Sequence, residues 1–256
     1  MSKETKIKND YRDSHKGLDK GVTYDSSFYK SNYKNLILKW EEKVLREILK
    51  KYKIKDYIDF ACGTGRITRI IEPYVENAKG IDVSASMLSI AKSKSQKAVF
   101  KEVDITREDV SEIDPVDLVS SFRFFTNAQE SLRKEVIDVL ATKIKPGGLF
   151  IFNLHMNSSS PFAVMARVYE KIAGKREGFN HLSLSDFKEK HLNRLGLEVV
   201  DIYALGLIPV IREEKIYPSW LLNILSKSEN AFSFIPGIKY FSKYQIIICR
   251  KKNDPK

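Results

Sequence analysis

The sequence has few cysteines, no long apolar run and no apolar leader. Cys62 and Cys249 are the two cysteines in 256 residues. Both fall in expected strands far apart, so we interpret them as small core residues of a protein in a reducing compartment. No apolar run approaches the ~18 residues of a membrane span, and the polar residues 1–20 lack the core of a signal peptide. These absences argue against a disulfide scaffold and predict a cytoplasmic protein without a transmembrane segment.

Acidic residues are fewer than basic residues, and most of the difference lies in the N-terminal part of the chain. The net charge is +11, with 15 Lys and Arg against 8 Asp and Glu in residues 1–55, and 29 against 25 in the remainder. A basic segment of this kind is typical of proteins that bind nucleic acid or anionic lipid. Lysine outnumbers arginine, however, which also fits a solvated basic helix without a partner. We favour the solvated helix and do not expect nucleic acid to be the partner.

Apolar strands and amphipathic helices alternate along the rest of the chain. This alternation is typical of a doubly wound α/β sheet. At 256 residues the chain fits one large domain, which buries roughly 70–75% of its unfolded surface. We expect helices at residues 31–52, 127–144, 161–173 and 185–195, and strands at residues 57–60, 78–83, 98–103, 116–121, 149–154, 197–205 and 244–250.

A glycine turn follows the first strand and opens a helix. Gly63 and Gly65 allow backbone to approach a ligand with no Cβ in the way. A dinucleotide-binding loop would have the pattern G-x-G-x-x-G, and Thr68 stands at the third glycine position. Asp59, just before the turn, suits a positively charged ligand and suits a pyrophosphate badly. The loop therefore disfavours a nicotinamide-dependent reductase.

Two further carboxylates end the next two strands. Asp82 lies 17 residues beyond Gly65, which is enough for one helix and a return to the neighbouring parallel strand. A carboxylate at such a strand end can accept hydrogen bonds from both hydroxyls of a ribose. Asp104 follows the third expected strand. Because parallel strands end at one edge of the sheet, a ligand is expected to lie across that edge.

Three motifs resemble those of class I S-adenosylmethionine (SAM)-dependent methyltransferases. They are Asp59-x-x-x-Gly63-x-Gly65, with Ala61 where the family often has glycine, then Asp82-Val83-Ser84-x-Ser86-Met87-Leu88, and the Lys145-Pro146-Gly147-Gly148 turn before the fifth strand. The resemblance covers residues 55–155 well and only the topology beyond. It implies a doubly wound, seven-stranded, mostly parallel sheet with helices on both faces. The last strand is antiparallel and lies beside the fifth.

The resemblance also implies a single domain, residues 1–256, with four parts. Residues 1–55 form a basic arm and helix, residues 56–155 bind the cofactor, and residues 156–196 and 206–242 are substrate-side insertions. The implied cofactor is SAM, with S-adenosylhomocysteine as product and no metal. In the family, the acid after the third strand accepts from the adenine amine. The expected cofactor-binding residues are Tyr24, Asp59, Ala61, Gly63, Gly65, Arg66, Asp82, Val83, Ser86, Met87, Asp104, Ile105, Ser121 and Phe122.

Aromatic residues precede the first helix. Tyr24, Phe28, Tyr29 and Tyr33 could pack that helix on the body, or they could form a lid over the cofactor. Members of the family often place a tyrosine-bearing N-terminal segment over the cofactor. We therefore expect an N-terminal helical lid that includes Tyr24.

The methyl acceptor is narrowed mainly by elimination. Adenine amine methylation calls for an Asn/Asp-Pro-Pro-aromatic run after the fourth strand, and this chain has Ser121-Phe122-Arg123-Phe124. Methylation at pyrimidine carbon 5 needs a cysteine nucleophile near strands four or five, and catechol methylation needs a metal-binding acidic cluster. Neither is found. We expect methyl transfer to a hydroxyl or amine of a small-molecule, sugar or lipid-linked acceptor. The runs Phe122-Arg123-Phe124-Phe125-x-Asn127 and Asn153-x-His155-x-Asn157 resemble those of bacterial methyltransferases of polysaccharide or other secondary biosynthesis.

Two strand-end residues are the catalytic candidates. His155 follows the fifth strand, and a near-neutral imidazole can take a proton from a hydroxyl acceptor. Arg123 follows the fourth strand, and its guanidinium can clamp a carboxylate or phosphate. The pair suggests an anionic acceptor. Alternatively, His155 hydrogen-bonds loop backbone and Arg123 pairs with a structural acid.

Two other functions stay open on the sequence alone. One is an RNA methyltransferase that uses the basic N-terminal arm, for which RNA binding would depend strongly on salt. The other is a scaffold that binds SAM without catalysis. The sequence is compatible with either a monomer or a homodimer.

Overall fold

Runs of Ile, Val, Leu and Phe form the strands of one seven-stranded sheet in the computed structural model. The structure describes residues 11, 31–173, 182–207, 216–232 and 235–253. The sheet order is β3-β2-β1-β4-β5-β7-β6. Its strands are β1 (Asp56–Phe60), β2 (Asn77–Asp82), β3 (Val99–Glu102), β4 (Val116–Ser121), β5 (Ile144–Leu154), β6 (Leu197–Leu205) and β7 (Tyr244–Lys251).

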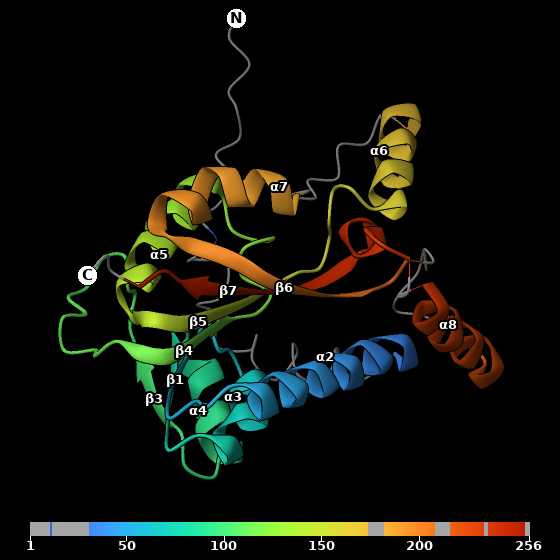
Figure 1. The fold of residues 1–256 in the computed structure, drawn as a ribbon. Coiled ribbons are helices and arrows are strands. Elements are labelled where there is room, and N and C mark those ends of the chain that lie inside the picture. Colours follow the sequence, from blue (N-terminus) through green and yellow to red (C-terminus); the bar gives the residue numbers. More distant parts are fainter. Residues whose placement is uncertain (1–10, 12–30, 174–181, 208–215, 233–234, 254–256) are drawn as a thin grey trace, which may run out of the picture.

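Helices cover both faces of this sheet (Figure 1). One face carries α2 (Asn32–Lys51), α3 (Arg66–Ile71), the short 3₁₀ turn η2 (Glu72–Tyr74) and α4 (Ala85–Lys94). The other face carries α5 (Glu130–Thr142) and α7 (Leu184–Phe187), which continues through π-helical turns at Lys188–Leu192 and a 3₁₀ turn at Asn193–Leu195. The strands are apolar on both faces because helices cover both.

The core on the α5 side is an aromatic cluster. Phe125 makes edge-on contacts with Phe150, Phe152 and Phe187, with ring centroids 5.9, 5.6 and 5.0 Å apart. Edge-to-face pairs of this kind are favourable beyond the area that they bury. The four rings fix α7 and the loop after β4 against the central strand β5.

The expected topology is confirmed. Strands β1 to β6 run parallel, and β7 pairs antiparallel with both β5 and β6. Cys62 and Cys249 are both buried and unbridged. Within the described ranges, no helix is long and apolar enough to cross a membrane.

The boundary between α5 and β5 differs from the expectation. The helix ends at Thr142 and the strand starts at Ile144, so residues 145–148 lie inside β5 and not in a turn before it. Gly147 has φ 75°, and the pairing with β4 shifts register between Val116 and Leu118. The motif therefore forms an irregular start of the strand, which a glycine with positive φ permits.

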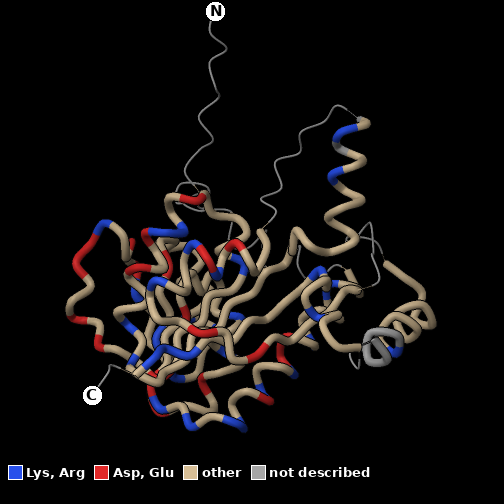
Figure 2. Tube along the Cα trace, turned by 45° about the horizontal axis from the view of Figure 1, so that its top comes forward, with Lys and Arg blue, Asp and Glu red and all other residues tan. Residues whose placement is uncertain are grey.

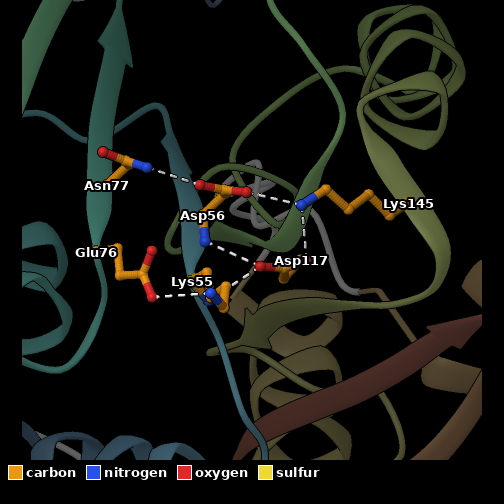
Figure 3. A network of polar contacts seen from close by, with 6 residues as sticks. All are labelled: Lys55, Asp56, Glu76, Asn77, Asp117 and Lys145. Atoms are coloured by element: carbon orange, nitrogen blue, oxygen red, sulfur yellow. Dashed lines mark hydrogen bonds and ion pairs between the residues drawn. The ribbon is translucent and has the colours of Figure 1, made fainter.

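A polar network joins the amino ends of four strands (Figure 3). The Nζ atom of Lys145 lies 2.7 Å from Asp56 Oδ2 and 2.9 Å from Asp117 Oδ1. The other Asp117 oxygen accepts from the backbone N–H groups of Lys55 and Asp56, and Asn77 donates to Asp56. These bonds hold β1, β2, β4 and β5 together at the edge opposite the strands' carboxyl ends.

Two helices leave the sheet from its carboxyl edge. The chain passes from β5 to α6 (Pro161–Ala173), and between β6 and β7 it forms α8 (Ser219–Phe232) and the short η5 (Ile238–Phe241). Because β6 is parallel to β5, the end of β6 and the start of β7 lie at that same edge. In Figure 1 both helices stand away from the body at one end of the molecule.

The network predicts a stability role for Lys145. We expect Lys145→Met to lower the free energy of unfolding by about 1–2 kcal/mol at neutral pH, because two carboxylates lose a shared cation that is partly exposed. The pKa of Asp56 is lowered by hydrogen bonds from Asn77 and Lys145. For Asp117, burial alone would raise the pKa, but hydrogen bonds from Lys145 and the backbone lower it overall. Carboxylates with depressed pKa values stabilise the fold above pH ~4 and lose that effect in acid, so the difference should shrink below pH ~4.

Urea unfolding at pH 7 and pH 3 measures this difference. Lys134→Met is the matched control, since Lys134 pairs with Asp138 on the exposed face of α5 at 3.3 Å. It should change stability by less than ~0.5 kcal/mol. Equal effects of the two substitutions would contradict the role given to the network.

Candidate functional site

A cavity lies at the carboxyl edge where β1, β2 and β4 end. Its wall brings together residues from the glycine turn, the second and third strand ends and the loop after β4. Eleven predicted site residues line it. They are Asp59, Ala61, Gly63, Arg66, Asp82, Val83, Met87, Asp104, Ile105, Phe122 and Arg123.

Asp82 is held in place by backbone at the cavity wall. Its Oδ2 accepts from the Gly63 N–H at 2.8 Å, and its Oδ1 accepts from the Ser84 N–H at 2.9 Å. The residue is 8% exposed. These bonds fix the carboxylate orientation and tie the end of β2 to the glycine turn, where the ribose was expected.

The turn between β1 and α3 depends on left-handed backbone. Gly63 has φ 54° and Gly65 has φ 72°, and a Cβ on Gly65 would lie 3.0 Å from the Ala91 Cβ. Ala61 also has a positive φ, 54°. That position is the one where the family often has glycine, and the observed backbone supplies the reason. Such backbone strain concentrates at functional sites.

Asp59 lines the base of the cavity and is only 1% exposed. Its two carboxylate oxygens accept from Thr68 Oγ1 at 2.6 Å and from Ser120 Oγ at 2.7 Å. Burial raises the pKa of Asp59 to about 6, although both hydrogen bonds oppose the rise. Asp59 thus joins β1, β4 and α3, and a cationic ligand nearby would favour its ionised form.

The third strand end supplies Asp104 and the neighbouring apolar wall. Asp104 Oδ1 accepts from Thr106 N and Oγ1 at 3.0 and 2.7 Å. Ile105 and Val103 are buried beside it and line the cavity. An acid beside two aliphatic side chains could accept a hydrogen bond from the adenine amine while the aliphatic groups contact the ring. This role of Asp104 stays a prediction.

Glu41 is the site residue that the sequence did not reveal. It lies on α2, is 1% exposed, and its Oε2 lies 2.7 Å from Arg66 Nη1. Its Oε1 lies 3.6 Å from Arg123 Nη2. Two arginines on the cavity wall therefore share one buried carboxylate. A glutamate within a basic amphipathic helix carries no local sign of such a pairing.

The loop after β4 holds Arg123 in an uncommon conformation. Its φ is 63°, outside the region that most side chains adopt. The Arg123 N–H donates to Asn153 Oδ1 at 2.6 Å, and Asn127 Nδ2 donates to the Arg123 carbonyl at 2.6 Å. Two asparagines from different elements thus fix the backbone, and the guanidinium reaches both Glu41 and the cavity.

His155 differs from its expected role in two respects. It is not among the residues that line the cavity. Burial lowers the pKa of His155, and the positive charges of Arg123 and Lys243 contribute, to about 3. The expectation of a near-neutral imidazole is therefore wrong. Its Nδ1 is buried without a hydrogen-bond partner among the described residues.

The remaining predicted residues lie around or outside this cavity. Gly65, Ser86 and Ser121 are close in sequence to its wall but do not line it. Tyr24, Phe28 and Tyr29 lie outside the described residues. Tyr33 packs with Ile37, Leu205, Leu225 and Tyr244, so the lid expectation is wrong for Tyr33.

An N-terminal tyrosine does line the cavity, but it is Tyr11. Its ring meets Phe124 edge-on with centroids 5.7 Å apart, and its N–H donates to Gln129 Oε1 at 3.3 Å. Tyr11 lies in the polar segment of residues 1–20, for which the sequence predicted no role in the site. The signal that could have found it is a lone aromatic in that polar segment.

Comparison with known proteins identifies the family. A family model described as "Methyltransferase domain" matches residues 58–148. A viral relative, "Putative methyltransferase 235L" of Invertebrate iridescent virus 6, is 37% identical over 223 residues, which cover 75% of this chain and 80% of that protein. This chain belongs to the class I SAM-dependent methyltransferases.

Two further similarities agree with the family. "Probable S-adenosylmethionine-dependent methyltransferase CRG1" of Saccharomyces cerevisiae is 35% identical over 105 residues, 38% of this chain, and the match spans only 36% of the yeast protein. The crystal structure of N-methyltransferase NodS from Bradyrhizobium japonicum, in complex with S-adenosyl-L-homocysteine, aligns with a TM-score of 0.56 at 13% identity. That alignment covers 86% of this chain and 88% of NodS, and it shows the shared fold.

The residues on the cavity wall fit SAM. The fixed Asp82 carboxylate suits ribose hydroxyls, and Val83, Val103 and Ile105 supply an apolar wall for a ring. The glycine turn leaves room for close approach of the ligand to backbone. In the described part of the chain, no group of three or more His, Cys, Asp or Glu side chains could hold a metal ion.

The geometry predicts the effect of removing the Asp82 carboxylate. We expect Asp82→Ala to weaken SAM binding by at least ~10-fold, because a charged hydrogen bond contributes about 1.5–3 kcal/mol. Calorimetric titration with SAM measures the affinity. Asp104→Ala is the matched control and should cost less, since an adenine amine can also reach backbone acceptors.

Since Asp82 also accepts from the Gly63 and Ser84 N–H groups, thermal unfolding must accompany each titration. Asp82→Asn, which keeps a carbonyl acceptor, should retain more of the fold's stability and still bind SAM more weakly than the wild type. Unchanged SAM affinity in a folded Asp82→Ala protein would refute the ribose assignment.

Proposed function

We propose that this methyltransferase transfers the SAM methyl group to a hydroxyl or amine of an anionic small-molecule, sugar or lipid-linked acceptor. SAM supplies an activated methyl on a sulfonium, so the protein's main task is to align an acceptor lone pair with it. We keep a cytoplasmic location and a monomer or homodimer as parts of this proposal. Of the basic segment 1–55, residues 1–10 and 12–30 lie outside the described residues.

The observation that carries the proposal is the pairing of two arginines with one buried glutamate at one part of the cavity wall. Arg66 and Arg123 both line the cavity, and both pair with the single carboxylate of Glu41. Around Glu41, two cations share one anion, so positive charge is in local excess there, whereas Asp59, Asp82 and Asp104 line the part of the wall that we assign to the cofactor. In a partly buried site that charge is screened less than at the surface, so it favours an anionic group on a ligand.

Arg123 is the better placed of the two for the acceptor. Arg66 belongs to the glycine turn, next to the cofactor residues, whereas Arg123 belongs to the loop after β4. The distance of 3.6 Å to Glu41 is longer than the 2.7 Å of the Arg66 pair. A guanidinium presents a fork of donors that matches carboxylate or phosphate oxygens. We assign Arg123 to anion recognition on the acceptor.

The role of His155 follows from its pKa. A general base works best when its pKa lies near the working pH, and a pKa of about 3 lies far below it. Neutral His155 is a weak proton acceptor in this setting. We propose that alignment carries most of the catalysis, and that His155 contributes to the packing of the loop after β5.

Removing the Arg123 charge should affect acceptor binding. We expect Arg123→Gln to raise KM for anionic acceptors by ~10-fold or more, with a smaller effect on kcat and on neutral acceptors, because a charged hydrogen bond contributes about 1.5–3 kcal/mol. S-adenosylhomocysteine release is measured over a panel of hydroxyl and amine acceptors that differ only in a carboxylate or phosphate.

Arg250→Gln is the matched control, since Arg250 is exposed on β7 and stacks over Tyr52, away from the cavity. It should leave KM unchanged. Calorimetry with SAM should give the same affinity for wild type and for both variants. If neutral acceptors are preferred by the wild type, the anionic acceptor class is wrong.

The pH profile of turnover tests whether His155 acts as a general base. Because the folded pKa is lowered to about 3, the imidazole stays neutral from pH 5 to 9. We expect His155→Gln to keep turnover within ~10-fold of wild type and to leave the profile over that range unchanged. A loss of ~10² or more together with disappearance of an acid limb would establish His155 as the general base.

A further inference from the structure

Large apolar side chains are exposed mainly at one end of the molecule. Among the described residues with strong exposure, the exceptions are Tyr74, Val99 and Val200. The others belong to α6 or to residues 216–241. They are Val164, Met165, Val168, Tyr169, Ile172, Ile216, Trp220, Ile224, Ile235, Tyr240 and Phe241. Large exposed apolar patches mark interaction sites.

Helix α6 presents its apolar face to solvent. Val164, Val168 and Ile172 follow each other at four-residue spacing and are 47%, 53% and 81% exposed. Met165 and Tyr169 extend the same face and are 51% and 67% exposed. A helix of a globular protein normally turns such a stripe toward the core. This helix stands away from the body (Figure 1), and its apolar stripe is exposed to solvent.

Basic residues flank the apolar face of α6. Arg167 and Lys171 are exposed one turn apart on the side of the helix next to Val164 and Val168. Figure 2 shows basic positions in blue along the projecting helix. An apolar face with a cationic border is the pattern of helices that lie in the headgroup region of a bilayer.

The base of α6 is fixed to the body, so its orientation is set. Lys243 Nζ lies 3.7 Å from the ring centroid of Phe162, and Arg167 Nη2 donates to the Ser158 carbonyl at 3.0 Å. Asn157 Nδ2 donates to the carbonyls of Tyr240 and Ser242 at 2.8 and 2.9 Å. These contacts join the start of α6 to η5, whose Tyr240 and Phe241 are among the exposed aromatics.

Helix α8 adds a second apolar face at the same end. Its Leu225 is buried against Tyr33, Leu205 and Tyr244, which anchors the helix to α2 and to β6 and β7. Trp220 and Ile224, one turn apart, are 63% and 54% exposed. Tryptophan and tyrosine concentrate where an apolar phase meets water.

The two faces belong to convex, projecting helices, and basic side chains border them. A bilayer surface can cover separate projecting faces at once, and anionic headgroups match Arg167, Lys171 and Lys239. Because α6 and α8 both leave from the carboxyl edge of the sheet, a membrane against them would lie at the edge that carries the cofactor cavity.

We propose that the face formed by α6, α8 and η5 binds the surface of an anionic lipid membrane. The apolar and aromatic side chains enter the headgroup region, and the basic side chains contact lipid phosphates. The proposal concerns a surface outside the cavity and does not depend on which acceptor is methylated.

The test is co-sedimentation of the full-length protein with vesicles. The vesicles contain phosphatidylcholine alone or phosphatidylcholine mixed with phosphatidylglycerol. The wild type should bind the anionic vesicles more tightly, and added salt should weaken binding. Val168→Asp with Ile172→Asp should reduce binding at least ~10-fold, since it places two charges in the apolar face. Arg167→Gln and Lys171→Gln should each lower affinity for anionic vesicles by about 5-fold.

Val99→Asp is the matched control, because Val99 is 64% exposed on the edge strand β3, remote from this face in sequence and sheet order. It should bind vesicles like the wild type. All variants should bind SAM with unchanged affinity in calorimetry, which separates loss of membrane binding from misfolding and from failure of the proposed enzyme function.

Two results would overturn the proposal. One is vesicle binding that is absent in the wild type or unchanged in Val168→Asp with Ile172→Asp. The other is a concentration-dependent dimer in sedimentation velocity that these substitutions abolish while vesicles are not bound. That second result would assign the face to a second copy of this chain.

Discussion

Glu41 is the carboxylate on which the arrangement of the cavity depends. It reaches from α2 to Arg66 in the glycine turn and to Arg123 in the loop after β4. A buried charge of this kind is costly unless it is paired, and removal of one partner typically costs 3–5 kcal/mol. The N-terminal helix is therefore part of the site's electrostatics. Without it, two guanidiniums would face each other across the cavity wall with no counter-charge from α2.

The sheet and the strand-end acids could be predicted from sequence because their signals are local. An apolar run followed by glycine or an acid marks the end of a strand, and Asp59, Asp82 and Asp104 all lie where those patterns indicated. The antiparallel last strand came from family resemblance, and the pairing of β7 with β5 confirms it. The start of β5 was misjudged because Pro146 and its glycines indicate a turn, whereas Lys145 binds the ends of neighbouring strands.

Other parts of the site depend on contacts between distant segments. Glu41 and its two arginines are 25 and 82 residues apart, and no pattern within α2 marks the pairing. The low pKa of His155 arises from burial and from Arg123 and Lys243, which only the fold brings near. Tyr11 was missed because its polar neighbours suggested a segment without contacts. The sequence could thus predict which strand-end residues line the cavity, but it could not predict the charge pairs around Glu41 or the pKa of His155.

The position of β7 also constrains how the chain acquires its structure. β6 pairs only with β7 among the described strands, and β7 lies between β5 and β6. During synthesis, the first five strands can pair as they emerge, but β6 has no partner until residues 244–251 leave the ribosome. Until then, β6 is an unpaired strand between the segments that carry α7 and α8. An unpaired strand edge can pair with another chain and cause aggregation. Completion of the sheet by β6 and β7 therefore waits until residues 244–251 have been synthesised.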